Sequence, residues 1–305
     1  MLGSFLFYKE GTLPVNKNDT TPKIFVIKQG ENLNTIARDL SAQGLIRNRL
    51  VFYWIVKDRG YETKIQAGDF RLSPAMNANE IAETLTHGTL DNWVTFIEGM
   101  RKEEIAQIVS KNFNIPEVEF ISVAPEGTLF PDTYLMPRDA TTGAIISIMT
   151  NTFNQKYTPE MREKARKLGL SDQQVLILAS IVEREANSTD RQQIASILLR
   201  RLREDIKLQA DATVQYALGY QPDEKSWWKK NLSLDDLALN SLYNTYKVTG
   251  LPPGPISNPS ISSIEAVVNA DPNTPYLFYI HDPQGGTHYA RNGDEHEANI
   301  KKYLQ

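Results

Sequence analysis

The chain has no cysteine among its 305 residues, which excludes disulfide bonds, thiol catalysis and zinc sites with cysteine ligands. Its net charge of -4 provides no basic surface for nucleic acid, so a DNA- or RNA-binding protein is not expected. A glycine-rich dinucleotide fingerprint and a phosphate-binding P-loop are both missing. The four histidines do not have the spacing of metal ligands, so we expect no catalytic metal.

Long apolar runs are missing as well. The chain opens with the mostly apolar residues MLGSFLFY, but these are too few to cross a bilayer, which takes about 20 residues. Two interpretations of residues 1–22 stay open. They form a frayed tail, or they are the end of a membrane anchor followed by a polar stalk.

What the chain does have is an ordinary globular composition, with 41% hydrophobic and 23% charged residues. Its length favours two domains over one. Strand-like and helical segments follow one another without the regular alternation of a doubly wound sheet, so we expect an α+β fold.

A repeated pattern marks the N-terminal part. Three helix-like segments carry an Ile-Ala pair near their middle, and each follows a short strand-like run; the runs are residues 23–29, 67–74 and 92–98. A further apolar helix is predicted over residues 45–60. Residues 23–90 therefore read as β-α-α-β-α, an order similar to that of LysM modules. A small packing module without a ligand is the alternative.

Residues 91–305 are expected to form a larger mixed α+β domain. A loop rich in proline is predicted over residues 125–141, and a strand over residues 275–282. Helices are predicted over residues 143–168, 172–187, 189–204, 260–270 and 293–304.

The segment VLILASIVEREAN, residues 175–187, reads as a buried helix that ends in two glutamates. With 3.6 residues per turn, Glu183 shares a face with small or polar residues that include Ser180 and Asn187. Small side chains there would leave a groove for a ligand. Glu185 points nearly opposite, so we expect it to be solvated or to form a surface ion pair.

A carboxyl group in an apolar groove has its pKa raised, because burial disfavours the charged form. A general acid that works near pH 7 needs such a pKa. Glu183 is therefore the candidate acid of the sequence. The alternative is that it caps a neighbouring segment or pairs with a buried arginine.

Three further clusters combine amides, hydroxyls, carboxyls and aromatic rings, which suit the polar rims and apolar faces of sugars. A carbohydrate-binding groove is the prediction, and ordinary loops with core tyrosines are the alternative. The candidate binding residues are Glu126, Asp132 and Tyr134 in the first cluster, Gln209, Asp211, Thr213 and Tyr216 in the second, and Tyr243, Asn244, Thr245 and Tyr246 in the third.

Four motifs together resemble the endolytic murein transglycosylase (YceG-like) family. They are EGTLFPDTY, LASIVEREA, LLRRLREDIKLQADATVQYALG and YNTYKVTGLPPGPISNPSISSIEAVVN, and they occur in the family's order. The resemblance extends over nearly the whole chain after residue 22. It implies cleavage of the β-1,4 bond between N-acetylmuramic acid and N-acetylglucosamine inside peptidoglycan strands, leaving 1,6-anhydro ends. It also implies that no organic cofactor takes part.

The resemblance assigns the single catalytic glutamate to Glu183, which would act first as acid and then as base. It further implies an N-terminal anchor in the cell membrane, an extracytoplasmic location and glycan synthases, the penicillin-binding proteins, as partners. One departure concerns Ala212, because the family usually has proline after the aspartate that matches Asp211; the loop is therefore expected to be less rigid here. A muramidase with a second carboxylate, such as Asp211 or Glu126, and a non-catalytic wall-binding scaffold stay open as alternatives.

Overall fold

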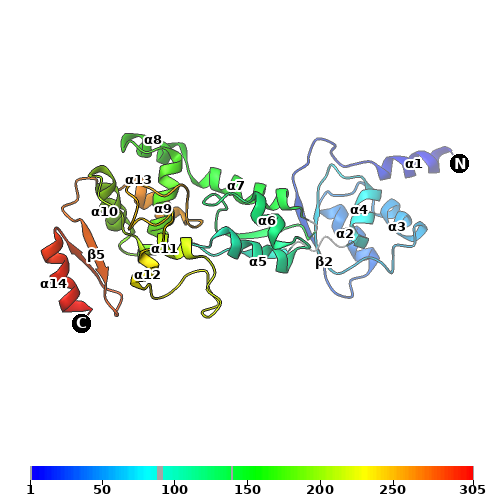
Figure 1. The fold of residues 1–305 in the computed structure, drawn as a ribbon. Coiled ribbons are helices and arrows are strands. Elements are labelled where there is room, and N and C mark those ends of the chain that lie inside the picture. Colours follow the sequence, from blue (N-terminus) through cyan, green and yellow to red (C-terminus); the bar gives the residue numbers. More distant parts are fainter. Residues whose placement is uncertain (1, 88–91, 139, 305) are drawn as a thin grey trace. The chain divides into compact units, whose positions relative to one another are not determined.

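The structure is a computed structural model that describes residues 2–87, 92–138 and 140–304 (Figure 1). The chain packs into two compact units. Unit 1 comprises Met1–Val94 and Tyr134–Ala140, and unit 2 comprises Thr95–Thr133 and Thr141–Gln305. Each unit has a core of its own, so we describe each by itself.

Unit 1 is a small α+β unit in which β1 and β2 form an antiparallel strand pair. Strand β1 pairs with β2 so that Lys23 lies opposite Leu72 and Ile27 opposite Gly68. The observed order, β1-α2-α3-β2-α4, agrees with the predicted β-α-α-β-α order, and the likeness to LysM stays a prediction. The elements are α1 (Leu2–Thr12), β1 (Lys23–Ile27), α2 (Leu33–Ala42), α3 (Arg49–Asp58), β2 (Gly68–Leu72) and α4 (Ala78–His87).

Local sequence explains where the helices of unit 1 begin. The side chain of Asn32 accepts a hydrogen bond from Thr35 N at the start of α2, and Asn48 caps α3 in the same way. In β1 the buried residues alternate with exposed ones, which directs Phe25 and Ile27 into the core.

Within the first 22 residues, α1 is helical over Leu2–Thr12. Among the residues that the structure describes, no helix is both long and apolar enough to cross a membrane. The anchor stays a prediction.

Unit 2 is mostly helical, and its strands β5 and β6 pair antiparallel. Strands β3 and β4 pair with each other where the chain passes between the units, and most of their residues belong to unit 1. The strands are β3 (Asn92–Thr95), β4 (Thr133–Met136), β5 (Phe278–His281) and β6 (Thr287–Ala290). The helices are α5 (Lys102–Asn112), α6 (Glu117–Val123), α7 (Thr142–Lys156), α8 (Pro159–Lys167), α9 (Asp172–Glu185), α10 (Arg191–Arg203), α11 (Asp211–Leu218), α12 (Leu234–Leu237), α13 (Ile261–Val268) and α14 (Gly293–Tyr303).

Several predicted elements of unit 2 need correction. The single helix expected over residues 143–168 is divided into α7 and α8, because Thr158 caps a new helix and Pro159 occupies its first turn. The predicted loop over residues 125–141 contains β4, and Asp211 begins the short helix α11 instead of preceding a loose loop.

Helix α9 is the centre of unit 2. Ser171 and Gln174 form a capping box at its start, and every residue from Val175 to Val182 is buried. Helices α13, α10 and α11 pack around it. The polar side chains at the end of α9 therefore emerge from a fully packed core, and their surroundings are set by the neighbouring elements.

Candidate active site

The small-residue face of α9 is covered by the chain itself. Ser180 Oγ accepts a hydrogen bond from Ile256 N at 3.0 Å, and Ser257 Oγ donates to Ser180 O at 3.1 Å. All three residues are completely buried. The small side chains thus make room for the loop before α13, and the prediction of an open groove on this face is wrong.

Glu183 lies under the same loop. Its Oε2 accepts hydrogen bonds from Ser260 N at 2.8 Å and from Ser260 Oγ at 2.5 Å, while Arg191 Nη2 lies 3.4 Å from Oε1. Its side chain is only 5% exposed. Ser260 is also the cap of α13, so Glu183 fastens the start of that helix. This arrangement matches the capping alternative of the sequence analysis.

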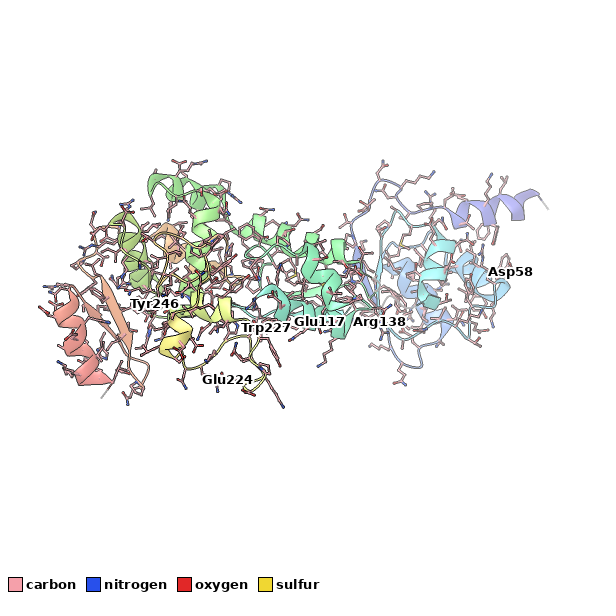
Figure 2. The ribbon with its side chains drawn as sticks, in the orientation of Figure 1. Asp58, Glu117, Arg138, Glu224, Trp227 and Tyr246 are labelled. Atoms are coloured by element: carbon pink, nitrogen blue, oxygen red, sulfur yellow. The ribbon has the colours of Figure 1, made fainter. Side chains whose placement is uncertain are left out.

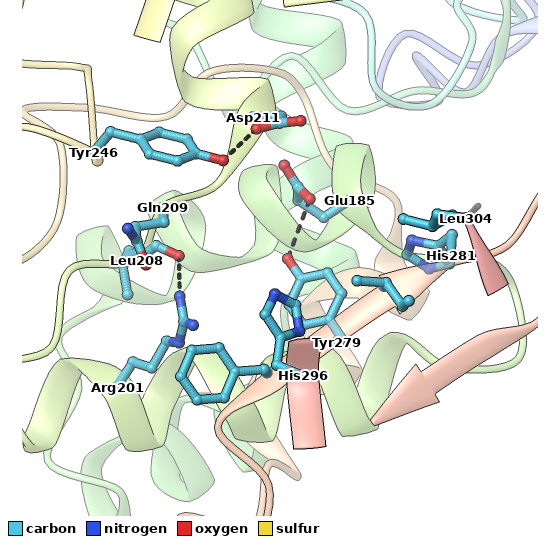
Figure 3. A pocket seen from close by; sticks show the side chains of 12 residues that line it. Glu185, Arg201, Leu208, Gln209, Asp211, Tyr246, Tyr279, His281, His296 and Leu304 are labelled. Carbon is cyan, nitrogen blue, oxygen red and sulfur yellow. Dashed lines mark hydrogen bonds between the residues drawn. The ribbon is translucent and has the colours of Figure 1, made fainter. Parts of the chain in front are cut away.

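Glu185 is the carboxyl that faces a pocket. Its Oε1 accepts a hydrogen bond from Ala212 N at 2.9 Å, and its Oε2 accepts one from Tyr279 OH at 3.1 Å (Figure 3). The prediction that Glu185 is solvated or paired at the surface is wrong. Burial raises the pKa of Glu185 to about 7, and the negative charge of Asp211 adds to this rise.

The pocket has a volume of about 590 Å³ and lies entirely within unit 2. Its walls come from the end of α9, the start of α11, the loop after α12, strand β5 and helix α14 (Figure 3). The lining residues are Glu185, Arg201, Leu208, Gln209, Asp211, Tyr246, Phe278, Tyr279, Ile280, His281, His296 and Leu304.

Three of the predicted binding residues line this pocket. They are Gln209, Asp211 and Tyr246, the last of which is also labelled in Figure 2. Tyr246 OH donates a hydrogen bond to Asp211 Oδ1 at 2.5 Å. Burial and the Asp211 carboxylate raise the pKa of Tyr246, which therefore stays a neutral donor.

Three others lie behind this wall and hold it in place. Thr213 and Thr245 are completely buried, with their hydroxyl oxygens 2.9 Å apart. Asn244, also buried, donates to the carbonyls of Leu237 and Leu239 and accepts from Tyr246 N. These side chains position the pocket residues and do not line the pocket.

The far side of the pocket carries positive and aromatic groups. Arg201 donates to the carbonyls of Leu277 at 2.7 Å and Leu208 at 2.8 Å, and its guanidinium lies 4.8 Å from the Phe278 ring centroid. His296 stacks on Phe278. Burial and the nearby Arg201 lower the pKa of His296, so its ring is neutral at pH 7.

Glu126 lies in a separate buried network. It accepts hydrogen bonds from Asn258 Nδ2 at 2.7 Å and from Lys102 N, and Tyr216 OH lies 3.4 Å away. Burial raises the pKa of Glu126 to about 7. Tyr243 packs its ring against that of Tyr216. This network joins the start of α5 and helix α11 to the loops of Glu126 and Asn258, and none of these residues lines the pocket of Glu185.

The remaining predicted residues lie elsewhere. Asp132 is exposed and accepts a hydrogen bond from Thr133 N. Tyr134 is buried and belongs to unit 1. Asn187 is exposed and donates to Gly285 O at 3.2 Å. Ser180 is buried under the loop before α13, where it bonds to Ile256 and Ser257. The pocket brings none of these four together.

Tyr279, Arg201 and His296 were not predicted as site residues. The only sequence signal for Tyr279 is its place in the strand-like run PYLFYIHD, which does not say what the strand faces. Among the described residues, no group of three His, Asp or Glu side chains is arranged to hold a metal ion. The pocket offers acid, base and hydrogen-bond chemistry instead.

Comparison with known proteins gives a consistent result. The model of the YceG-like family matches residues 25–302. The endolytic murein transglycosylase of Bacillus subtilis (strain 168) is 30% identical, and the match covers 99% of this chain and 90% of that protein. The endolytic murein transglycosylase of Streptococcus pneumoniae serotype 2 is 27% identical, with 98% of this chain and 62% of that protein covered.

A solved structure is similar as well. The crystal structure of a yceG-like protein from Listeria monocytogenes superposes with a TM-score of 0.61 at 28% sequence identity. The match covers 91% of this chain and 99% of that one.

Proposed function

The chain belongs to the YceG-like family, and from this premise we propose that it is an endolytic murein transglycosylase with Glu185 as its acid and base. The substrate is the glycan strand of peptidoglycan. The bond cleaved is the β-1,4 bond between N-acetylmuramic acid and N-acetylglucosamine within the strand.

The observation that carries this assignment is the state of Glu185. It is a carboxyl group with a pKa of about 7 that lines a pocket large enough for a sugar. A group with this pKa is partly protonated at neutral pH and can give up its proton in the transition state. Glu183 differs from it in its surroundings, because its oxygens face Ser260 and Arg191 and it does not line this pocket.

One carboxyl group suffices for the proposed reaction. The proton of Glu185 goes to the glycosidic oxygen as its bond to C1 breaks. The C6 hydroxyl of the same muramyl residue then closes onto C1, and its proton returns to Glu185. No water is consumed, so atoms balance with a 1,6-anhydro end as product.

The rest of the pocket suits this substrate. Tyr246 adds an aromatic ring to the lining, which suits the apolar face of a sugar, and Gln209 provides an amide for hydroxyl or N-acetyl groups. The carboxylate of Asp211 lies close enough to Glu185 to raise its pKa. A negative charge there stabilises the positive charge that develops at C1.

Because Asp211 is a second carboxyl group in the pocket, a muramidase is the second candidate function. A hydrolase needs a second carboxylate that acts as base or nucleophile, and Asp211 shares the pocket with Glu185. The two reactions differ in their end groups, because hydrolysis leaves reducing ends and no anhydro ring.

Two matched variants test the assignment of the acid. Purified glycan strands are incubated with Glu185→Gln and with Glu183→Gln, and chain shortening is followed by chromatography. We expect Glu185→Gln to lose at least about 100-fold in rate, the scale of a general acid, with its circular dichroism unchanged. Glu183→Gln keeps activity and loses stability. Cleavage by Glu185→Gln together with loss in Glu183→Gln would return the role to Glu183.

We further propose, from the family resemblance, that the chain acts at the extracytoplasmic face of the cell membrane, beside penicillin-binding proteins that supply new strands. The N-terminal residues would continue a membrane anchor. Fractionation of cells that express the full-length protein, with cross-linking to the synthases, tests both points. Recovery in the cytoplasmic fraction would contradict this location.

A further inference from the structure

The two oxygens of Glu185 have unlike partners. Oε1 faces a backbone donor, Ala212 N, and Oε2 faces a hydroxyl group, Tyr279 OH. Ala212 is the second residue of α11, where backbone N–H groups have no partner within the helix. The N–H of Ala212 is therefore free to serve the carboxyl group on the neighbouring helix.

This difference determines where a proton can lie. A backbone N–H can only donate, so Oε1 must remain an acceptor as long as this hydrogen bond is kept. A hydroxyl group can donate or accept by rotation. In a neutral carboxyl group the carbonyl oxygen is a better acceptor than the hydroxyl oxygen, so this arrangement favours the proton on Oε2. Tyr279 can bind that oxygen both before and after the proton leaves.

We propose that Ala212 N–H and Tyr279 OH are positioning groups that assign separate tasks to the two oxygens of Glu185 and together set the pH range in which the acid works. Ala212 N–H holds Oε1 as a fixed anchor. Tyr279 OH holds Oε2, the oxygen that gives and later takes back the proton. This inference rests on the proposed role of Glu185.

The groups around Glu185 shift its pKa in opposite directions. Burial and the charge of Asp211 raise the pKa of Glu185, whereas the hydrogen bonds from Ala212 and Tyr279 and the charge of Arg184 lower it. Other titratable groups around the pocket are Tyr246, which binds Asp211, and the side chains of Arg201, His281 and His296. Each of the two hydrogen bonds lowers the pKa of Glu185, so the loss of either donor should raise it.

His281 has a partner that keeps it from replacing Tyr279. Its Nε2 lies 3.2 Å from Asp190 Oδ2, and the side chain of Asp190 is only 5% exposed. Thr287 donates to the same carboxylate oxygen. His281 is thus held by Asp190, and the hydroxyl of Tyr279 is the side-chain partner of Oε2.

Proline is the substitution that isolates the backbone donor. Ala212→Pro removes the N–H, and proline is tolerated in the first turn of a helix. The matched control is Ala212→Gly, which removes only the methyl group and keeps the N–H. Tyr279→Phe removes the hydroxyl and keeps the ring. Circular dichroism and thermal unfolding verify that each variant folds.

The primary measurement is the pH profile of strand cleavage between about pH 5 and 9. In the wild type we expect activity to fall as pH rises through about 7, where Glu185 loses its proton. Ala212→Pro and Tyr279→Phe should move this fall upward by about one pH unit, the size expected for one lost hydrogen bond to a charged group. Ala212→Gly should keep the wild-type profile. A reduced rate with an unmoved profile in both variants would show a merely structural role and overturn the proposal.

A second readout separates this inference from the proposed function. Carbon-13 NMR of labelled glutamate carboxyl groups, with Glu185→Gln to identify the signal, follows the titration of Glu185 without any substrate. If the wild type does not cleave strands but the titration moves upward in both variants, the proposed function fails and the positioning role stands. If the wild type cleaves and the titration does not move, the positioning role fails.

Discussion

Replacement of Glu185 by glutamine should make the protein more stable at alkaline pH. The pKa of this carboxyl is about 7 in the folded protein, against 4.5 for the ordinary group. At about 1.4 kcal/mol per pKa unit, this gap of about 2.5 corresponds to ~3 kcal/mol. The physical reason is that folding places a carboxyl in a pocket where its charged form is disfavoured.

The direction of this change in stability with pH follows from proton binding. Between pH 4.5 and about 7 the folded state holds a proton on Glu185 that the unfolded state has lost. The contribution of Glu185 to the free energy of unfolding therefore falls as pH rises through this window, and this contribution is constant above it. Glu185→Gln has no proton to lose, so its stability should not show this part of the decrease.

Urea unfolding at pH 5 and pH 8, followed by circular dichroism, measures the effect. We expect the stability of Glu185→Gln relative to wild type to improve by about 2.5 kcal/mol between the two pH values, because a small part of the change has already occurred at pH 5. Glu126 also has a pKa of about 7, but it is present in both proteins and cancels in the comparison. The surface variant Glu163→Gln controls for the change in net charge. An equal or lower relative stability of Glu185→Gln at pH 8 would refute the reasoning, because it would mean that the two hydrogen bonds outweigh burial.

Other substitutions test the buried network beside Glu126 and the charge of Asp211. Asn258→Ala should lower the free energy of unfolding by about 3 kcal/mol, because this fully buried amide accepts from Gly127 N and Leu129 N and its loss leaves buried groups unpaired; calorimetry that finds less than about 1 kcal/mol would contradict this. Gly127→Ala should cost about 2 kcal/mol or more, because φ is 91° there and a Cβ would lie 2.5 Å from Pro255 Cγ; an unchanged melting temperature would count against the geometry. Asp211→Asn should move the alkaline fall in activity to lower pH, because the charge of Asp211 raises the pKa of Glu185; a move to higher pH would exclude this repulsion.

The sequence predicted helix α9, but its small-residue face, which was interpreted as an open groove, is covered by the chain. The period of 3.6 residues per turn placed Glu183 on the small-residue face. Small residues, however, leave room either for a ligand or for another segment of the chain. Here Ile256 and Ser257 fill that side. What covers a helix face depends on contacts between residues far apart in the sequence, which periodicity does not encode.

The candidate binding residues show the same division. Asp211 and Tyr246 reach the pocket, and both belong to the polar clusters identified in the sequence. Asn244 and Thr245 adjoin Tyr246 in the chain but turn into the protein, because a buried loop must satisfy its own polar groups. Tyr279 could not be predicted, since its role depends on where β5 packs against the end of α9.

The most direct test of the central claim is mass spectrometry of the fragments released from purified peptidoglycan strands. A lytic transglycosylase with Glu185 as its acid predicts fragments from within the strands that end in 1,6-anhydro-muramyl residues. These should be present for the wild type and for Glu183→Gln, and missing for Glu185→Gln. Fragments with reducing ends, which are heavier by one water, would contradict the account and establish a hydrolase. Strands that stay intact with the wild-type protein would also contradict it and would favour a non-catalytic binding protein.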